Sequence, residues 1–211
     1  MLRKFSTPPI VVLLSVALSG CAFTPDRINL EYVPQSNVQA TDAARGIRVD
    51  VTVKDVRTQT DRVGAKGVAN QAAAIISNQD VTAVVKQAID AELVQRGYAL
   101  APGNVRIACD LSNFSATWQV GFWSGSAHGS CQLSVKIKDK EGELVFSEIV
   151  AGEATEKGIQ VTSGDNAKVV LERALQDAMK KLFEMPDFFH SISKANSRME
   201  LAHPRPATPG N

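Results

Sequence analysis

Runs of alternating apolar and polar residues most constrain the fold of this 211-residue chain. They occupy residues 47–56, 105–122 and 131–137, and a shorter apolar stretch follows at residues 144–151. A period of two is typical of β-strands with one buried and one solvated face. Such strands need a second layer over their apolar face, and helices are the economical cover.

The longest run changes parity in its middle. Its apolar residues occupy odd positions as far as Leu111 and even positions from Phe114 onward. Because side chains alternate between the two faces of a sheet, a shift by one residue predicts a β-bulge. We expect that bulge near Ser112.

Two segments, 77–97 and 165–183, have helical periodicity. Ser77 and Asp80 match a capping box at the start of the first, and Gly97 is a typical C-terminal stop. Asp165 is the N-cap candidate of the second, which is amphipathic. The order of elements predicts an α+β two-layer sandwich: a mainly antiparallel sheet of about four to five strands with two helices on one face.

The N-terminus resembles a secretory signal. Arg3 and Lys4 precede an apolar stretch, residues 10–18, which is too short to span a membrane. Leu18-Ser19-Gly20-Cys21 follows and resembles the bacterial lipobox, in which the cysteine is lipidated and the preceding peptide is removed. The alternative is an ordinary cleaved signal with a chance cysteine. With Ala22 instead of the Asp of an inner-membrane retention signal, the motif predicts lipidation at Cys21 and an outer-membrane destination.

Composition divides the chain into four parts. Residues 1–20 are the predicted signal peptide, and loop-type residues in 21–45 predict a lipidated N-terminus and tether. Residues 46–194 form one α+β domain, and the Pro-rich segment 195–211 predicts a disordered tail. Within the tether, a short edge strand is indicated by the alternating residues Ile28, Leu30 and Tyr32.

Charge and cysteine content narrow the function classes. Removal of Arg3 and Lys4 lowers the formal net charge from +1 to −1, which gives no electrostatic case for nucleic acid. Beyond Cys21 the chain holds Cys109 and Cys131, an even remainder that is a disulfide candidate in an oxidising periplasm. The bridge requires a hairpin turn close to residue 120. A later turn leaves two buried free thiols.

The glycine-rich segment 121–129 does not have the spacing of a serine hydrolase motif. His128 has Ser124 and Ser126 nearby, but a turn with an exposed histidine is the favoured interpretation. The three histidines contain no close pair. We therefore expect no enzyme activity, no metal and no cofactor.

Aromatic residues gather in the predicted hairpin. Phe114, Trp118, Phe122 and Trp123 either form a stacking platform for glycan or a partner, or pack the sheet against the helices. Packing is favoured, and Trp123, beside Ser124, is the member expected to be exposed.

Several short motifs resemble the YajG-like outer-membrane lipoproteins. Besides the lipobox, they are Asp55-Val56-Arg57-Thr58, the helix from Asp80 through Glu92, and Arg96-Gly97-Tyr98. The Pro-rich tail and the pair Cys109 and Cys131 depart from the family pattern. The resemblance implies a lipid-anchored envelope protein and transfers no catalytic residue.

Together these observations predict a non-catalytic envelope lipoprotein, an interaction or accessory module facing the periplasm. Its expected partners are the membrane, through the N-terminal lipid, and an envelope protein. Arg57 and Trp123 are the candidate contacts to that protein. The alternative is a module that binds lipid or cell-wall glycan, resembling auxiliary lipoproteins of lipid-transport systems.

We expect Cys21→Ser to leave a full-length precursor in the inner membrane, because lipidation of the cysteine precedes cleavage. Immunoblotting of fractionated membranes against the 211-residue standard measures this. A lipid-free protein cleaved normally after residue 20 would contradict the lipobox.

Overall fold

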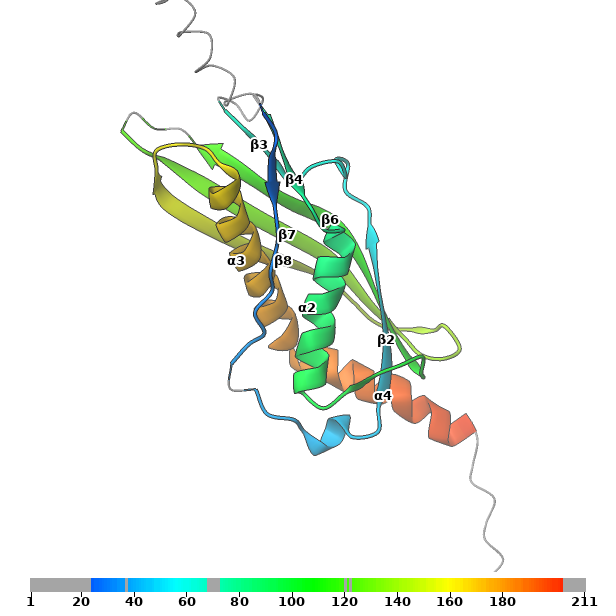
Figure 1. The fold of residues 1–211 in the computed structure, drawn as a ribbon. Coiled ribbons are helices and arrows are strands. Elements are labelled where there is room, and N and C mark those ends of the chain that lie inside the picture. Colours follow the sequence, from blue (N-terminus) through cyan, green and yellow to red (C-terminus); the bar gives the residue numbers. More distant parts are fainter. Residues whose placement is uncertain (1–23, 37, 68–72, 120, 122, 203–211) are drawn as a thin grey trace, which may run out of the picture.

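One mixed sheet and the helices on one of its faces build the domain (Figure 1). The computed structural model describes residues 24–36, 38–67, 73–119, 121 and 123–202. Within them the sheet has eight strands, and three α-helices and one 3-10 helix, η2 (Asp42–Ala44), accompany it. The strands are β1 (Asp26–Ile28), β2 (Arg48–Asp55), β3 (Gly64–Lys66), β4 (Ala73–Ser77), β5 (Ala99–Leu100), β6 (Val105–Gln119), β7 (Gly125–Lys138) and β8 (Leu144–Ile159).

Strand β6 is the centre of this sheet. One edge pairs antiparallel with β7, which pairs antiparallel with β8. The other edge is divided: β2 runs parallel to it as far as Leu111, and β3 joins it at Ala116. Strand β3 carries β4 and β1, and β2 carries β5, so the sheet branches.

The predicted sheet is therefore wrong in size and in direction. Four of its pairs, β1 with β4, β2 with β5, β2 with β6 and β3 with β6, are parallel. The strands that the sequence did not reveal, β3, β4 and β5, are two to five residues long, too short for a periodic pattern. The short edge strand indicated by Ile28, Leu30 and Tyr32 corresponds to β1, which ends at Ile28. The bulge is confirmed, since the β6–β7 register shifts between Leu111 and Asn113.

The helices are α2 (Val81–Gln95), α3 (Gly164–Phe183) and α4 (Pro186–Ala202). Asp80 caps α2 by accepting a hydrogen bond from the Thr82 amide, and Gly97 follows its end with φ of 94°. Ser163, not Asp165, caps α3. Helix α4 continues through residues 195–202, so the predicted disordered tail is wrong there. Residues 203–211 lie outside the described residues.

Small residues let α3 lie directly on β7 and β8. A Cβ atom at Gly129 would lie 2.1 Å from the Val170 carbonyl oxygen, and one at Gly152 would lie 2.1 Å from that of Ala174. The helix backbone thus takes the place of side chains. Strand β8 was predicted over residues 144–151, but it continues to Ile159, paired with β7.

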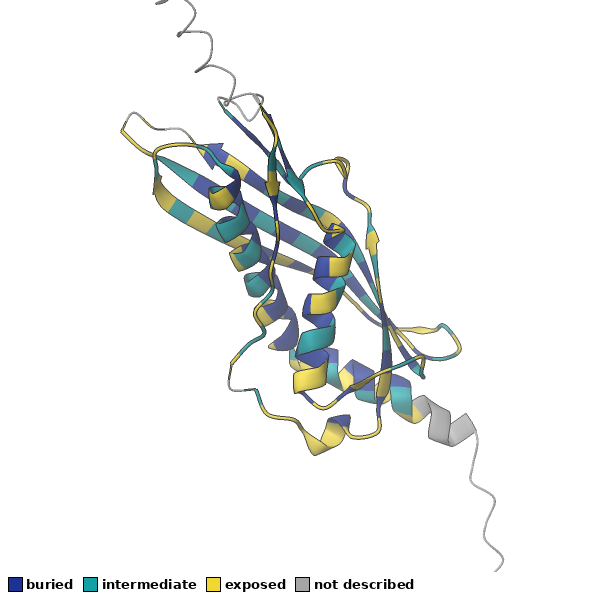
Figure 2. Ribbon diagram, in the orientation of Figure 1, coloured by how far each residue is buried: buried dark blue, intermediate teal, exposed yellow. Residues whose placement is uncertain are grey.

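The helix-facing side of the sheet is buried, and the opposite side stays open to solvent (Figure 2). Along β7, buried residues such as Leu133 and Val135 alternate with partly exposed ones such as Ser134. None of the described helices is both long and apolar enough to cross a membrane.

The N-terminal segment is not a tether from residue 24 onward. Strand β1 pairs with β4, and both Ile28 and Leu30 are buried in the core. Gln79 holds the Leu30 amide through its side-chain oxygen at 2.9 Å. The folded domain therefore includes most of segment 24–45, and the predicted boundary at residue 46 is wrong.

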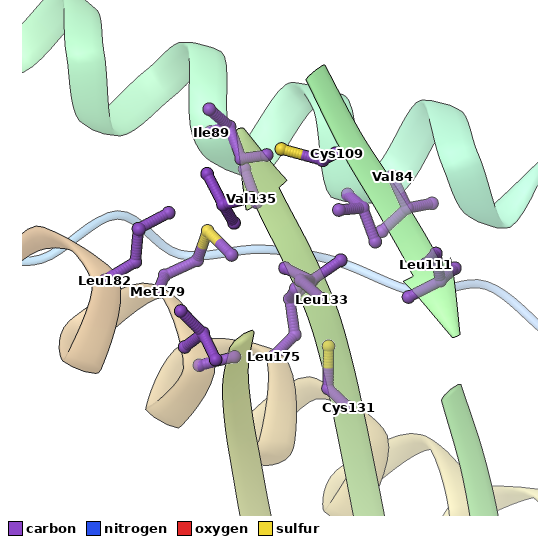
Figure 3. Close-up of a cluster of buried hydrophobic side chains, with 14 of the residues drawn as sticks. Val84, Ile89, Cys109, Leu111, Cys131, Leu133, Val135, Leu175, Met179 and Leu182 are labelled. Atoms are coloured by element: carbon purple, nitrogen blue, oxygen red, sulfur yellow. The ribbon is translucent and has the colours of Figure 1, made fainter. Parts of the chain in front are cut away.

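Cys109 and Cys131 are free and buried, which contradicts the predicted disulfide. Cys109 lies opposite Val135, whereas Cys131 lies opposite Phe114, because β6 ends at Gln119 and β7 begins at Gly125. Cys109 therefore points toward α2 and Cys131 toward α3 (Figure 3). Burial raises the pKa of each thiol to about 12, so both behave as small apolar core residues.

Candidate functional site

The divided edge of β6 creates a groove. Between Leu111, where β2 ends its pairing, and Ala116, where β3 begins, β6 has no strand neighbour on that side. A groove of about 630 Å³ opens there. We call it the branch groove and define it by Arg57, Thr58, Gln59, residues 62–65 and residues 112–117.

The branch groove opens on the sheet face that no helix covers. Phe114 and Ala116 are buried under the helices, so the alternating side chains of Asn113, Ser115 and Thr117 point to the opposite face. Hydroxyl and amide groups therefore line its β6 side.

Arg57 fills the gap between the strands. Its guanidinium donates to both carboxylate oxygens of Asp55, with Nη2 to Oδ2 at 2.8 Å. It also donates to the backbone carbonyls of Arg62 and Phe114, each at 3.2 Å. The Phe114 carbonyl faces the missing strand, so Arg57 supplies the donor that a strand would supply.

Arg57 is buried and its guanidinium is engaged by Asp55 and backbone carbonyls, so it lines the branch groove from inside, and the partner contact at this residue stays a prediction. The motif Asp55-Val56-Arg57-Thr58 is a clamp that closes the strand and holds the following loop. The hydrogen bond from Arg57 is the main cause that lowers the pKa of Asp55 below its usual value.

Unlike Arg57, the second arginine of the branch groove, Arg62, has a side-chain N–H donor without an acceptor. Its side chain is half-buried, and its Nε lies 3.8 Å from Asp61 Oδ2 without a hydrogen-bond acceptor. A buried donor of this kind favours a partner that brings an acceptor. Arg62 lies in an irregular loop, and no periodicity or motif in the sequence indicated it.

A second polar cluster fastens the N-terminal segment to α2. Glu92 is fully buried and forms an ion pair with Arg96 one turn later. It also accepts from the Tyr32 hydroxyl at 2.6 Å and from the Gln35 amide at 2.8 Å. The guanidinium of Arg96 lies 4.6 Å from the centre of the Phe183 ring, a cation–π geometry.

A cavity of about 380 Å³ lies beside this cluster. Its lining is mainly apolar in surface and consists of Val38, Gln39, Thr41, Ala43, Arg96, Tyr98, Phe189, His190 and Ser193. The sequence did not indicate it, because its walls come from the N-terminal segment, the end of α2 and α4.

His128 contacts two hydroxyl groups on the open face of the sheet. Its Nε2 lies 2.7 Å from Ser126 Oγ, and its Nδ1 lies 3.0 Å from Thr155 Oγ1. A catalytic triad needs a carboxylate at Nδ1 to orient the ring and stabilise its cation. Thr155 occupies that place, and the described residues contain no cluster of metal ligands.

The aromatic residues of the hairpin divide into core and surface. Phe114 and Trp118 are buried, which confirms packing for these two, while Phe122 lies outside the described residues. Trp123 in the β6–β7 turn is 88% exposed, as expected. Cys21 also lies outside the described residues. The fold does not bring Arg57 and Trp123 together, since Arg57 lines the branch groove and Trp123 lies in the β6–β7 turn.

Residues 34–192 match the family described as uncharacterized lipoprotein. No curated protein sequence matches the chain. Among solved structures, protein XCC0632 from Xanthomonas campestris, of the DUF330 family, is similar at 13% identity and a TM-score of 0.56, over 82% of this chain and 99% of that one. A minor lipoprotein from Acinetobacter baumannii matches at 9% identity and a TM-score of 0.38, over 64% and 89% of the two chains. The Xanthomonas likeness shows a shared fold.

We expect Arg57→Met to lower the free energy of unfolding by about 3 kcal/mol, because it leaves Asp55 and the Phe114 carbonyl without their donor. Asp55 has a lowered pKa when folded, so its contribution is present above its unfolded pKa and lost as pH falls through its folded pKa. The difference between the two proteins should therefore narrow below about pH 4. Urea unfolding at pH 7 and at lower pH measures both effects.

The matched control is Arg62→Met, which makes the same change at a half-buried arginine of the same loop. An equal loss of stability in both variants would contradict the clamp.

Proposed function

The chain belongs to the uncharacterized lipoprotein family, and from that premise we propose a non-catalytic lipoprotein that recruits an envelope protein at the branch groove. Cys21 carries the lipid and holds the protein at the outer membrane, with the folded domain in the periplasm. The signal-like charge, apolar stretch and lipobox of residues 3–21 support this address.

The branch groove is the observation that carries the proposal. It lies on the uncovered face of the sheet, and Arg57 and Asp55 hold its shape from behind. Arg62 offers a positive charge and an unused donor, and Thr117 and Gln59 are exposed at its rim. These groups fit a partner surface that presents carboxylates or backbone carbonyls.

The site chemistry supports binding instead of catalysis. His128 has hydroxyl partners on both nitrogens, and the branch groove holds no histidine or cysteine among its described residues. We assign it no reaction step.

Photo-crosslinking in cells tests this function. A crosslinker at Gln59 or Thr117 should capture one discrete envelope protein, whereas one at the exposed residue Glu184, far away on the helix side, should not. Arg62→Gln should lower the yield from Gln59 about tenfold, because it removes a charge-assisted hydrogen bond. Absence of a discrete adduct at both rim positions, or equal adducts at Glu184, would overturn the proposal.

The cavity beside Tyr98 favours a second candidate, a module that binds an apolar ligand such as a lipid chain. Its volume of about 380 Å³ and its apolar walls fit part of such a ligand. It lies between elements that Glu92 and Arg96 fasten together, so its walls are preformed.

Native mass spectrometry of a soluble, unlipidated form that lacks residues 1–21 tests this candidate. A co-purifying lipid is expected if the cavity binds one, and Ser193→Trp should remove it by filling the space. Ser197→Trp, on the same helix but outside the cavity walls, is the control. A ligand that survives Ser193→Trp, or no ligand at all, would contradict the cavity as the site.

A further inference from the structure

The two most exposed large apolar side chains of the described residues lie at one end of the domain. Trp123 is 88% exposed in the β6–β7 turn, and Val161 is 74% exposed in the loop between β8 and α3. The two loops meet, because Trp123 and Thr162 line one small hollow together with Gln160. We call this surface the apolar tip and define it by Gly121, Trp123, Ser124, Gln160 and Val161.

The N-terminal strand begins at the same end of the domain. Asp26, the first residue of β1, accepts a hydrogen bond from the amide of Gly164 at 2.7 Å, and Gly164 opens α3 just after the tip loop. Lys66 binds the other carboxylate oxygen of Asp26 at 2.7 Å. The Gly67 amide donates to Thr162 at 3.0 Å. Figure 1 shows the start of β1 at the same end of the sheet as the adjoining ends of β6 and β7, whereas α4 extends to the opposite end.

Covalent geometry limits how far this end can be from the lipid. The five residues from Cys21 to Asp26 span at most about 17 Å when fully extended. The sequence predicted a tether of residues 21–45, but β1 fixes Asp26 in the sheet and removes most of that length. A lipid anchor at Cys21 therefore keeps the apolar tip close to the bilayer surface.

The chemistry of the tip suits that position. No residue of the apolar tip is charged, and Lys157 is exposed on the adjoining end of β8. Tryptophan prefers the membrane–water interface, where its ring is in an apolar layer and its N–H remains near water. Lysine at the edge of such a surface is attracted to anionic headgroups.

We infer that the apolar tip lies on the membrane surface, with Trp123 and Val161 in the lipid interface and the sheet standing away from the bilayer. This orientation rests on the proposed lipidation of Cys21. In this orientation the branch groove, which is lined by residues 112–117 of β6, stays accessible from the periplasm.

Fluorescence quenching by lipid tests the orientation. The mature lipoprotein is reconstituted in vesicles of phosphatidylethanolamine and phosphatidylglycerol that contain a headgroup-level spin-labelled lipid. With Trp118→Phe, Trp123 is the single tryptophan, and the quencher should lower its emission about twofold. Val161→Asp should reduce the quenching, because it places a charge in the apolar tip.

The control moves the single tryptophan to another turn. In Trp118→Phe, Trp123→Phe, Leu144→Trp the probe occupies the exposed start of β8, and its emission should not change with the quencher. Circular dichroism and urea unfolding confirm that each variant is folded. Equal quenching of both probes, or no quenching of Trp123, would overturn the orientation.

The mass of the reconstituted protein separates the two proposals. Acylated Cys21 with unquenched Trp123 overturns the orientation alone and leaves the anchor intact. An unmodified Cys21 overturns the anchor, and with it the orientation. Crosslinking of Trp123 to a protein in place of lipid quenching would assign the tip to that partner and would likewise overturn the orientation.

Discussion

The divided edge of β6 is the constraint on which the rest of the structure depends. A strand with two different neighbours on one side must leave backbone groups between them, and Arg57 satisfies one of these, the Phe114 carbonyl, with its side chain. The same guanidinium holds Asp55 at the end of β2 and the carbonyl of Arg62 in the loop. One ion pair thereby closes the sheet and shapes the groove on its open face.

Two further polar clusters fix the position of the N-terminal segment on the domain. Asp26 joins β1 to α3 and β3 through Gly164 and Lys66. Glu92 joins the segment after β1 to α2 through Tyr32 and Gln35. Because an unpaired buried charge is costly, these pairs fix the segment firmly against the domain. A length of chain that was predicted to be a tether is therefore part of the fold from β1 onward.

The two proposed surfaces are compatible with each other. The apolar tip lies at the end where β1 starts, and the branch groove lies on the open sheet face beside β3. Occupation of the first surface would therefore leave the second one accessible. The fold that it shares with protein XCC0632 shows that this arrangement of sheet and helices is not peculiar to one chain.

Local patterns in the sequence identified the long strands, the bulge near Ser112, the helix ended by Gly97 and the exposure of Trp123, because each depends on neighbours in the chain. The sequence alone also indicated the resemblance to lipoproteins, through Cys21 and the short motifs around Arg57 and Glu92. The sequence did not reveal the roles of Arg57 and Glu92, because the residue type alone does not show whether a charged side chain is buried in an ion pair or exposed to a partner.

Tertiary structure alone decided the remaining features. Strands as short as β3 and β5 carry no period and exist only because a neighbouring strand supplies their hydrogen bonds. Cys109 and Cys131 stay apart because the register of β6 against β7 is set by the turn and the bulge, which spacing in the sequence cannot specify. The proximity of Asp26 to Gly164, which brings the start of β1 to the loop before α3, arises from a contact between residues more than a hundred positions apart.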